Sequence, residues 1–266
     1  MKIAIIGFGN MGRTFANGFV NSQCLELNDI DIFSRSSIPL EQCFGIPESN
    51  IHLTLNDKIL AADIIIISVK PQDFVALASD LKKYITSSQV ILSVMAGVKI
   101  EKIQHLLHTD KIVRAMPNLP TQISFGITAL TASEAIDRKD LFIVQNLINT
   151  TGKSVYVEDE SLINAATAVS GSGPAYVFYF MQSMIDAALK LGFTKSQAQL
   201  LVKQTFLGAV NLYSTNSNSI EEWIRKVSSK GGTTEQAILS FEADELNEKI
   251  IKAVLKANEK AVELGS

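Results

Sequence analysis

Three glycines near the N-terminus have the spacing of a phosphate-binding turn. The segment Gly7-Phe8-Gly9-Asn10-Met11-Gly12 follows the apolar run 3–6 and precedes a helical pattern over 13–20. In such a turn the first glycine permits the bend, the second lets the backbone approach a pyrophosphate, and the third allows close helix packing. An ordinary glycine-containing turn is the alternative, but the strand before and the helix after favour dinucleotide binding by these six residues.

The residues after the second apolar run indicate which dinucleotide is bound. Folds that bind NAD usually end this strand on Asp or Glu, whereas here it ends on Ser34-Arg35-Ser36-Ser37. A guanidinium with hydroxyls beside it stabilises a 2′-phosphate, which a carboxylate would repel. A solvated serine-rich loop is the alternative. We predict that Ser34 and Arg35 bind the cofactor and that NADPH is preferred, with NADH possible.

A second glycine pair, Gly231-Gly232, lies in the C-terminal half and precedes Thr233 and Thr234. Thr233 and Gln236 have capping-box spacing, which predicts that a helix starts here with its free backbone amides available to an anion. Taken alone, the segment is more typical of an ordinary helix start with a capped hydroxyl.

Five ordered segments span almost the whole chain. They are the glycine turn 7–12, Val69-Lys70-Pro71-Gln72, Arg114-Ala115-Met116-Pro117-Asn118, Ser170-Gly171-Ser172-Gly173-Pro174-Ala175-Tyr176 and Ser228-Ser229-Lys230-Gly231-Gly232-Thr233-Thr234. Together these segments resemble the pyrroline-5-carboxylate reductase family. One departure is Lys230, because many members of the family have proline there.

The resemblance implies an activity and a set of site residues. The activity is NADPH-dependent reduction of 1-pyrroline-5-carboxylate to L-proline by hydride transfer to the C=N bond, the last step of proline biosynthesis. Thr234 is the implied catalytic residue, since its family counterpart donates a hydrogen bond to the pyrroline nitrogen. Gly231, Gly232, Thr233 and Thr234 form the implied substrate site. Beyond the turn and Ser34-Arg35, the expected cofactor-binding residues are Asn56, Val69, Lys70, Pro71, Met95, Ala96, Gly97, Pro117 and Asn118.

The proposed chemistry needs little from the protein beyond positioning. A cyclic imine is basic enough to take a proton from water before hydride arrives, so no strong protein acid is required. We therefore interpret Lys70 as a positioning residue and not as a proton donor.

Two other functions remain open at this point. A related imine reductase or a β-hydroxyacid dehydrogenase shares the expected architecture, but the β-hydroxyacid enzymes generally rely on a lysine motif that Lys190 and Lys203 do not match. A non-catalytic nucleotide-sensing protein would need the dinucleotide half without a carboxylate site.

Short apolar runs alternate with helical stretches in the first half of the chain. Runs that are apolar at consecutive positions are typical of strands covered by helices on both faces, which predicts a parallel α/β sheet. After the acidic Glu158-Asp159-Glu160, helical patterns take over, with capping-box spacing at Thr194/Gln197 and Ser219/Glu222. We predict an α/β fold: a Rossmann-type doubly wound sheet over 1–158, then an all-α dimerisation domain over 159–266. The strand-like runs are 3–6, 30–33, 64–69, 90–94, 112–115 and 128–130.

The composition of the chain argues against several classes of binding partner. The 266 residues carry a formal charge of 24 − 27 = −3, which argues against nucleic acid or an anionic membrane as the main partner. The apolar stretches are shorter than the roughly 20 residues of a membrane span. Two cysteines without a CxxC pair indicate a cytoplasmic protein. His105 and His108 lack further ligands, so we expect no metal site.

An apolar set formed by Phe178, Phe180, Met181 and Met184 fits a homodimer, and the resemblance implies that the dimer assembles into a higher homo-oligomer. Ordinary core packing within one chain is an equally good interpretation from composition.

Overall fold

The computed structural model describes residues 1–264, which form two compact units. The first contains Met1–Ser172 and a C-terminal segment that starts at Ala257, and the second contains Gly173–Lys256. This division comes later in the chain than the boundary that we predict after residue 158, because α5 (Ser161–Ala166) packs on strands of the first unit.

The first unit is built on an eight-stranded sheet of order β3-β2-β1-β4-β5-β6-β7-β8. The predicted α/β class and the six predicted strands are confirmed, and the two-residue β3 has no clear signal in the sequence. The strands are β1 (Ile3–Ile6), β2 (Ile30–Phe33), β3 (Ile51–His52), β4 (Ile64–Ile67), β5 (Val90–Ser93), β6 (Ile112–Met116), β7 (Gly126–Ala132) and β8 (Gly152–Tyr156).

The predicted parallel pairing is confirmed for every pair of neighbouring strands but one. Neighbouring strands are parallel except β6 and β7, which pair antiparallel with Met116 opposite Ala129. The connection between them, residues 117–125, is shorter than the dozen or so residues that a parallel crossover needs. The chain therefore returns beside β6 in the opposite direction.

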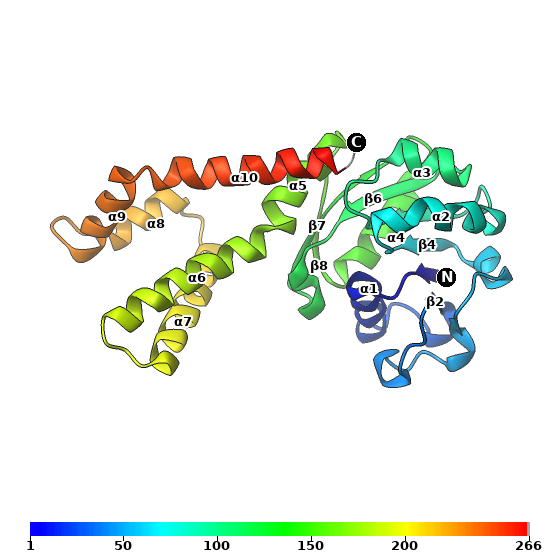
Figure 1. Cartoon of the computed structure of the whole chain (residues 1–266), viewed down its shortest axis with the longest axis horizontal. Helices are drawn as coiled ribbons and strands as arrows, with labels where there is room; N and C mark the ends of the chain where they lie inside the picture. The colour runs from blue at the N-terminus through cyan, green and yellow to red at the C-terminus, as the bar shows by residue number, and fades with distance from the viewer. Residues whose placement is uncertain (265–266) are drawn as a thin grey trace. The chain divides into compact units, whose positions relative to one another are not determined.

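Helices cover both faces of the sheet. On one face α1 (Asn10–Asn21) and α4 (Arg138–Asn149) pack against alternate strand residues, and on the other face α2 (Pro71–Leu81) and α3 (Ile100–Leu107) do so. All four isoleucines of β4 are buried, as a strand with helices on both sides requires. Figure 1 shows these helices around the strands of the first unit. Short 3-10 turns are η1 (Leu27–Asp29), η2 (Leu40–Gln42), η3 (Glu48–Asn50), η4 (Asp57–Ala61), η5 (Lys82–Tyr84) and η6 (Leu119–Ile123).

A buried charge ties β6 to the end of the first unit. The Arg114 side chain is 1% exposed and donates from Nη1 to Glu160 Oε1 (2.7 Å) and from Nη2 to Asn164 Oδ1 (2.8 Å). Glu160 Oε1 also accepts from the backbone N–H of Ile100, at the start of α3 (2.9 Å). The acidic stretch that marks the predicted domain boundary thus supplies the partner of a buried arginine. A π-helical turn, η7 (Thr167–Gly171), follows α5.

The second unit is helical, as predicted. The capping boxes at Thr194 and Ser219 are confirmed. The helices α6 and α7 contact each other, and Figure 1 shows them side by side in opposite directions. No helix in residues 1–264 is long and apolar enough to cross a membrane. The helices are α6 (Gly173–Lys190), α7 (Lys195–Ser214), α8 (Ile220–Val227), α9 (Thr233–Ala243) and α10 (Leu246–Glu263), the last of which continues into the first unit.

Several large apolar side chains of the second unit are exposed in the single chain. Phe178 is 59% exposed, and Phe180 and Met184 are also exposed. No residue of α6 is fully buried. Packing within one chain, the alternative that composition left open for this set, therefore does not cover these side chains.

Candidate functional site

The glycine turn after β1 has the geometry that its sequence predicts at two of the three glycines. Gly7 has a φ of +93°, and a Cβ there would lie 2.8 Å from Val69 Cγ1. A Cβ on Gly12 would lie 2.2 Å from the Gly7 carbonyl oxygen, so α1 approaches the turn more closely than any side chain allows. Ser68 donates its hydroxyl to that same carbonyl (2.6 Å). These contacts hold the turn against the end of β4.

Gly9 is the N-cap of α1, in an extended conformation without a side-chain cap, and a Cβ there would have no neighbour within 4 Å among residues 1–264. The first amides of α1 have no partner inside the helix. Open space beside unpartnered amides is what a pyrophosphate requires, so the turn fits a dinucleotide.

The predicted cofactor residues of the first unit gather at one edge of the sheet. Gly7, Ser34 and Pro117 directly follow β1, β2 and β6, and Val69 and Met95 lie two residues beyond the ends of β4 and β5. These strands are mutually parallel, so their carboxyl ends share an edge. The strand order reverses between β1 and β4, and ligands of open α/β sheets bind at such a switch point.

Arg35 is available to a ligand but has a partner within the chain. Its side chain is 84% exposed, and Nη2 contacts Asp73 Oδ2 at 2.9 Å. Asp73 lies in the first turn of α2, beyond Lys70 and Pro71. Ser34 is held by its backbone N–H, which donates to the His52 carbonyl (2.9 Å). Sequence reasoning missed Asp73, because no local pattern links it to Arg35.

The other predicted cofactor residues differ in what they can offer a ligand. Lys70 is the exposed N-cap of α2, and Pro71 is its first residue. Asn56 caps η4 by accepting from the Lys58 N–H (3.0 Å). The Met95 side chain belongs to the core, so only its backbone could reach a cofactor.

The remaining predicted cofactor residues lie on the loops that follow β5 and β6. Ala96 and Gly97 follow Met95, and Gly97 has a φ of +76°. Pro117 and Asn118 are buried after β6, and the Asn118 side chain bonds to Ser170 and Ile127.

The predicted substrate segment begins α9 in the second unit, with a different cap from the one expected. Gly232 is the N-cap and Thr233 is the first helical residue, so the predicted capping box of Thr233 and Gln236 is wrong. Gly232 takes the extended cap conformation, and its carbonyl accepts from the Gln236 N–H (3.3 Å). The amides of the first turn still lack helical partners, so the anion-binding potential of the segment remains.

An acidic side chain already contacts this segment. The Gly231 N–H donates to Glu235 Oε2 at 2.7 Å, and Gly231 has a φ of +75°. Within residues 1–264, the Thr234 hydroxyl makes no hydrogen bond and is therefore free for a ligand. The spacing of Gly231 and Glu235 across a helix start is the only sequence signal that could have indicated their bond.

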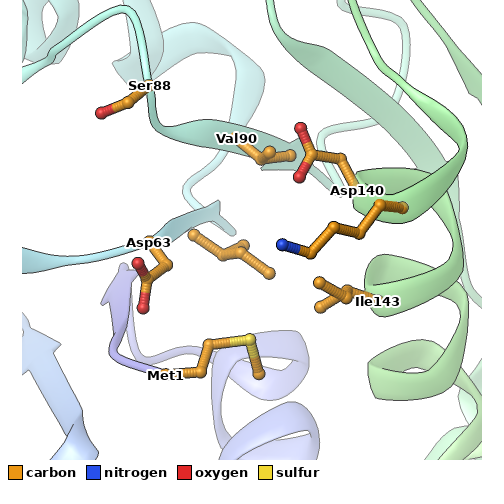
Figure 2. A pocket seen from close by; sticks show the side chains of 8 residues that line it. Met1, Asp63, Ser88, Val90, Asp140 and Ile143 are labelled. Carbon is orange, nitrogen blue, oxygen red and sulfur yellow. The ribbon is translucent and has the colours of Figure 1, made fainter.

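A pocket of about 260 Å³ lies elsewhere in the first unit. Met1, Asp63 and Ser88 line it at the amino ends of β1, β4 and β5, and Figure 2 shows them around it with Asp140 and Ile143 from α4. It is at the opposite end of the strands from the glycine turn. Asp140 is paired with Lys111 (2.7 Å), and Asp63 accepts from the Lys2 N–H (2.7 Å). We therefore do not assign the pocket to the dinucleotide.

No group of three or more metal-ligating side chains occurs within the described part of the chain. His108 is the left-handed C-cap of α3 with a φ of 54°. His108 therefore has a structural role, which is to end this helix.

Comparisons with known proteins connect both units to characterised families. Residues 160–264 match the family model for pyrroline-5-carboxylate reductase dimerisation, and residues 2–97 match the model described as NADP oxidoreductase, coenzyme F420-dependent. The chain is 35% identical to pyrroline-5-carboxylate reductase of Vibrio alginolyticus, over 99% of this chain and 97% of that protein.

Comparison with solved structures also finds pyrroline-5-carboxylate reductases. The chain is similar to a pyrroline-5-carboxylate reductase from Coxiella burnetii, with a TM-score of 0.89, 34% identity, and coverage of 100% of this chain and 98% of that one. It is also similar to Plasmodium falciparum pyrroline carboxylate reductase with NADP bound, with a TM-score of 0.87 and 26% identity, at the same coverage of the two chains.

Two glycine variants separate the ligand-binding and folding roles of the turn. Gly9→Ala should fold normally but weaken NADPH binding by about 10-fold, or about 1.4 kcal/mol, because the methyl group enters space that only a ligand would fill. Gly12→Ala should lower the free energy of unfolding by about 1–3 kcal/mol through its clash with Gly7. Thermal midpoints and NADPH titration measure both. Unchanged NADPH affinity in Gly9→Ala would show that the turn does not bind the cofactor.

Proposed function

The chain belongs to the pyrroline-5-carboxylate reductase family, and from this premise we propose that it reduces 1-pyrroline-5-carboxylate to L-proline with NADPH, the final step of proline biosynthesis. The resemblance inferred from the five sequence segments is confirmed at the level of the family. The observation that carries the proposed reaction is the start of α9, where a free threonine hydroxyl accompanies unpartnered amides. A protein that only sensed nucleotides would have no use for that second site.

The residues at the start of α9 suit a small carboxylate with a ring nitrogen. The amides of Thr233, Thr234 and Glu235 lack helical partners, and the positive end of the helix dipole favours a carboxylate there. The Thr234 hydroxyl can donate to a neutral imine nitrogen or accept from a protonated one, since a hydroxyl does both. Thr234 can therefore hold the nitrogen before and after its protonation.

The chemical step needs no strong acid from the protein. NADPH, when bound, would supply the hydride to the imine carbon. The ring nitrogen takes its proton from water, so the C=N double bond becomes a C–N single bond with one new C–H bond and one new N–H bond. The contribution of this chain is to orient the imine and to exclude competing water.

Arg35 supports the preference for NADPH over NADH. Its exposed guanidinium follows β2 at the position where a 2′-phosphate binds in this fold. Asp73 holds the guanidinium in the free chain, and an exposed pair of this kind exchanges readily for a phosphate.

The free cysteines support a cytoplasmic location. Cys24 is exposed, Cys43 is buried, and neither forms a disulfide. Burial raises the pKa of the Cys43 thiol, which keeps it protonated and unreactive. A reducing compartment suits both.

A direct assay tests the reaction and separates it from its competitors. We expect 1-pyrroline-5-carboxylate to cause oxidation of NADPH, with a higher kcat/KM than NADH under the same conditions. A β-hydroxyacid enzyme would instead oxidise its own substrate class, and a sensor would bind NADPH without turnover. Equal or better kcat/KM with NADH would contradict the role given to Arg35.

Thr234→Ala tests the residue that we place at the imine. We expect kcat to fall about 10-fold, because one hydrogen bond to the reacting nitrogen is worth about 1.5 kcal/mol, while NADPH affinity stays nearly unchanged. Ser240→Ala, an exposed hydroxyl further along α9, is the matched control and should keep full activity. Wild-type turnover in Thr234→Ala would exclude its role.

The exposed apolar faces of α6 and α7 support a homodimer that assembles further. Leu200, Leu207 and Val210 on α7 are exposed like Phe178 and Met184 on α6, and a second copy would bury them. Light scattering at micromolar concentration should give at least twice the chain mass of 29.0 kDa. A monomer under those conditions would contradict the proposal.

A further inference from the structure

The chain segment that leads into α6 contains a carbonyl that its own helix cannot satisfy. In an α-helical pattern, the Ser170 carbonyl would accept from the N–H of residue 174, but residue 174 is proline and has none. The proline ring also crowds a carbonyl four residues before it. The chain widens at this point into the π-helical turn η7, in which the Ser172 N–H reaches back to the Thr167 carbonyl (2.8 Å). The Ser170 carbonyl therefore lacks its α-helical donor and is open to an N–H from another element.

Asn118 supplies that donor from the loop after β6. Its Nδ2 donates to the Ser170 carbonyl at 3.2 Å, and the residue is 8% exposed. Its Oδ1 accepts from the Ile127 N–H at 3.0 Å. In the antiparallel β6–β7 pair, Met116 lies opposite Ala129. If this register is continued by two residues, Asn118 lies opposite Ile127. One amide side chain thus extends the β6–β7 pairing and joins it to η7.

Two further contacts hold the strand β6 that leads into this loop. Arg114, four residues earlier on β6, is bound to Glu160 and Asn164. A Cβ on Gly171 would come within 3.0 Å of Met116 Cε, so η7 packs closely on the end of β6. The side chains of Arg114, Met116 and Asn118 therefore contact the segment 160–171, and those of Met116 and Asn118 reach η7 itself.

We propose that Asn118 is a positioning residue for hydride transfer: by joining the Ser170 carbonyl to Ile127, it fixes the loop after β6 at the edge of the sheet where the dinucleotide binds. This inference rests on the proposed function. It assigns the Asn118 amide a role in orienting the loop, which differs from direct contact with the cofactor. A shift of this loop would alter the alignment of the reacting atoms more than the affinity for NADPH, because most of the cofactor is held elsewhere along the edge.

Asn118→Asp tests the role with little change in shape. The carboxylate keeps an acceptor for Ile127 but places an oxygen against the Ser170 carbonyl. The matched control is Asn50→Asp, because Asn50 is 5% exposed and donates its Nδ2 to the carbonyls of Asn28 and Ile30, at the amino ends of the strands. Both variants lose a buried amide donor, so both should lose stability to a similar degree.

The two variants should differ in catalysis. We expect Asn118→Asp to lower kcat by about 10- to 100-fold, with the NADPH dissociation constant changed by less than about three-fold. Asn50→Asp should keep kcat within about two-fold at a temperature where both are folded. A weaker NADPH affinity in Asn118→Asp with unchanged kcat would show direct cofactor contact and overturn the proposal. So would equal effects of the two variants on kcat.

Pro174→Ala provides a second test that leaves Asn118 intact, for the case in which Asn118→Asp does not fold. Alanine offers the Ser170 carbonyl a helical N–H and so weakens its bond to Asn118. We expect lower kcat and retained NADPH affinity here too, and wild-type kcat would overturn the inference. A failure of this inference can be distinguished from a failure of the proposed function by assaying the wild-type protein. If the wild type shows no pyrroline-dependent turnover, the proposed reaction itself is rejected.

Discussion

The buried guanidinium of Arg114 is the constraint on which much of the first unit depends. A buried charge is tolerated only when it is paired and hydrogen bonded, and removing one partner of such a pair typically costs about 3–5 kcal/mol. Glu160 and Asn164 provide the partners, and Glu160 also accepts from Ile100. The strand β6, the start of α3 and the helix α5 must therefore assemble together. That assembly brings η7 to the loop after β6.

The two places expected to bind ligand anions share a feature that net charge alone does not indicate. Arg35 contacts Asp73, and the Gly231 amide contacts Glu235, so each holds an acidic side chain of the same chain. A phosphate or a carboxylate would exchange with these groups. An acidic protein with a formal charge of −3 can bind anionic ligands in this way, because helix N-termini and single cations act over short distances.

Most of the fold followed from local patterns. The glycine turn, the buried strands such as 64–67 and the capping boxes at Thr194 and Ser219 each depend on residues close together in the chain, and the structure has all of them. The local pattern gave a wrong prediction at one helix start, where two neighbouring residues could each be the N-cap. At the start of α9, Thr233 had the spacing of a cap, but Gly232 takes the cap position.

The amino-acid sequence by itself determined the α/β class and the family, and it indicated the segments that we propose for dinucleotide and substrate binding, because these depend on periodicity and short motifs. Only the tertiary structure decided the antiparallel β6–β7 pair, the pairing of Arg114 with Glu160 and the bonds of Asn118 to Ser170 and Ile127. The sequence does show that Pro174 leaves one carbonyl without a helical donor. Which side chain satisfies it depends on contacts between residues about fifty positions apart, and those exist only after the sheet has formed.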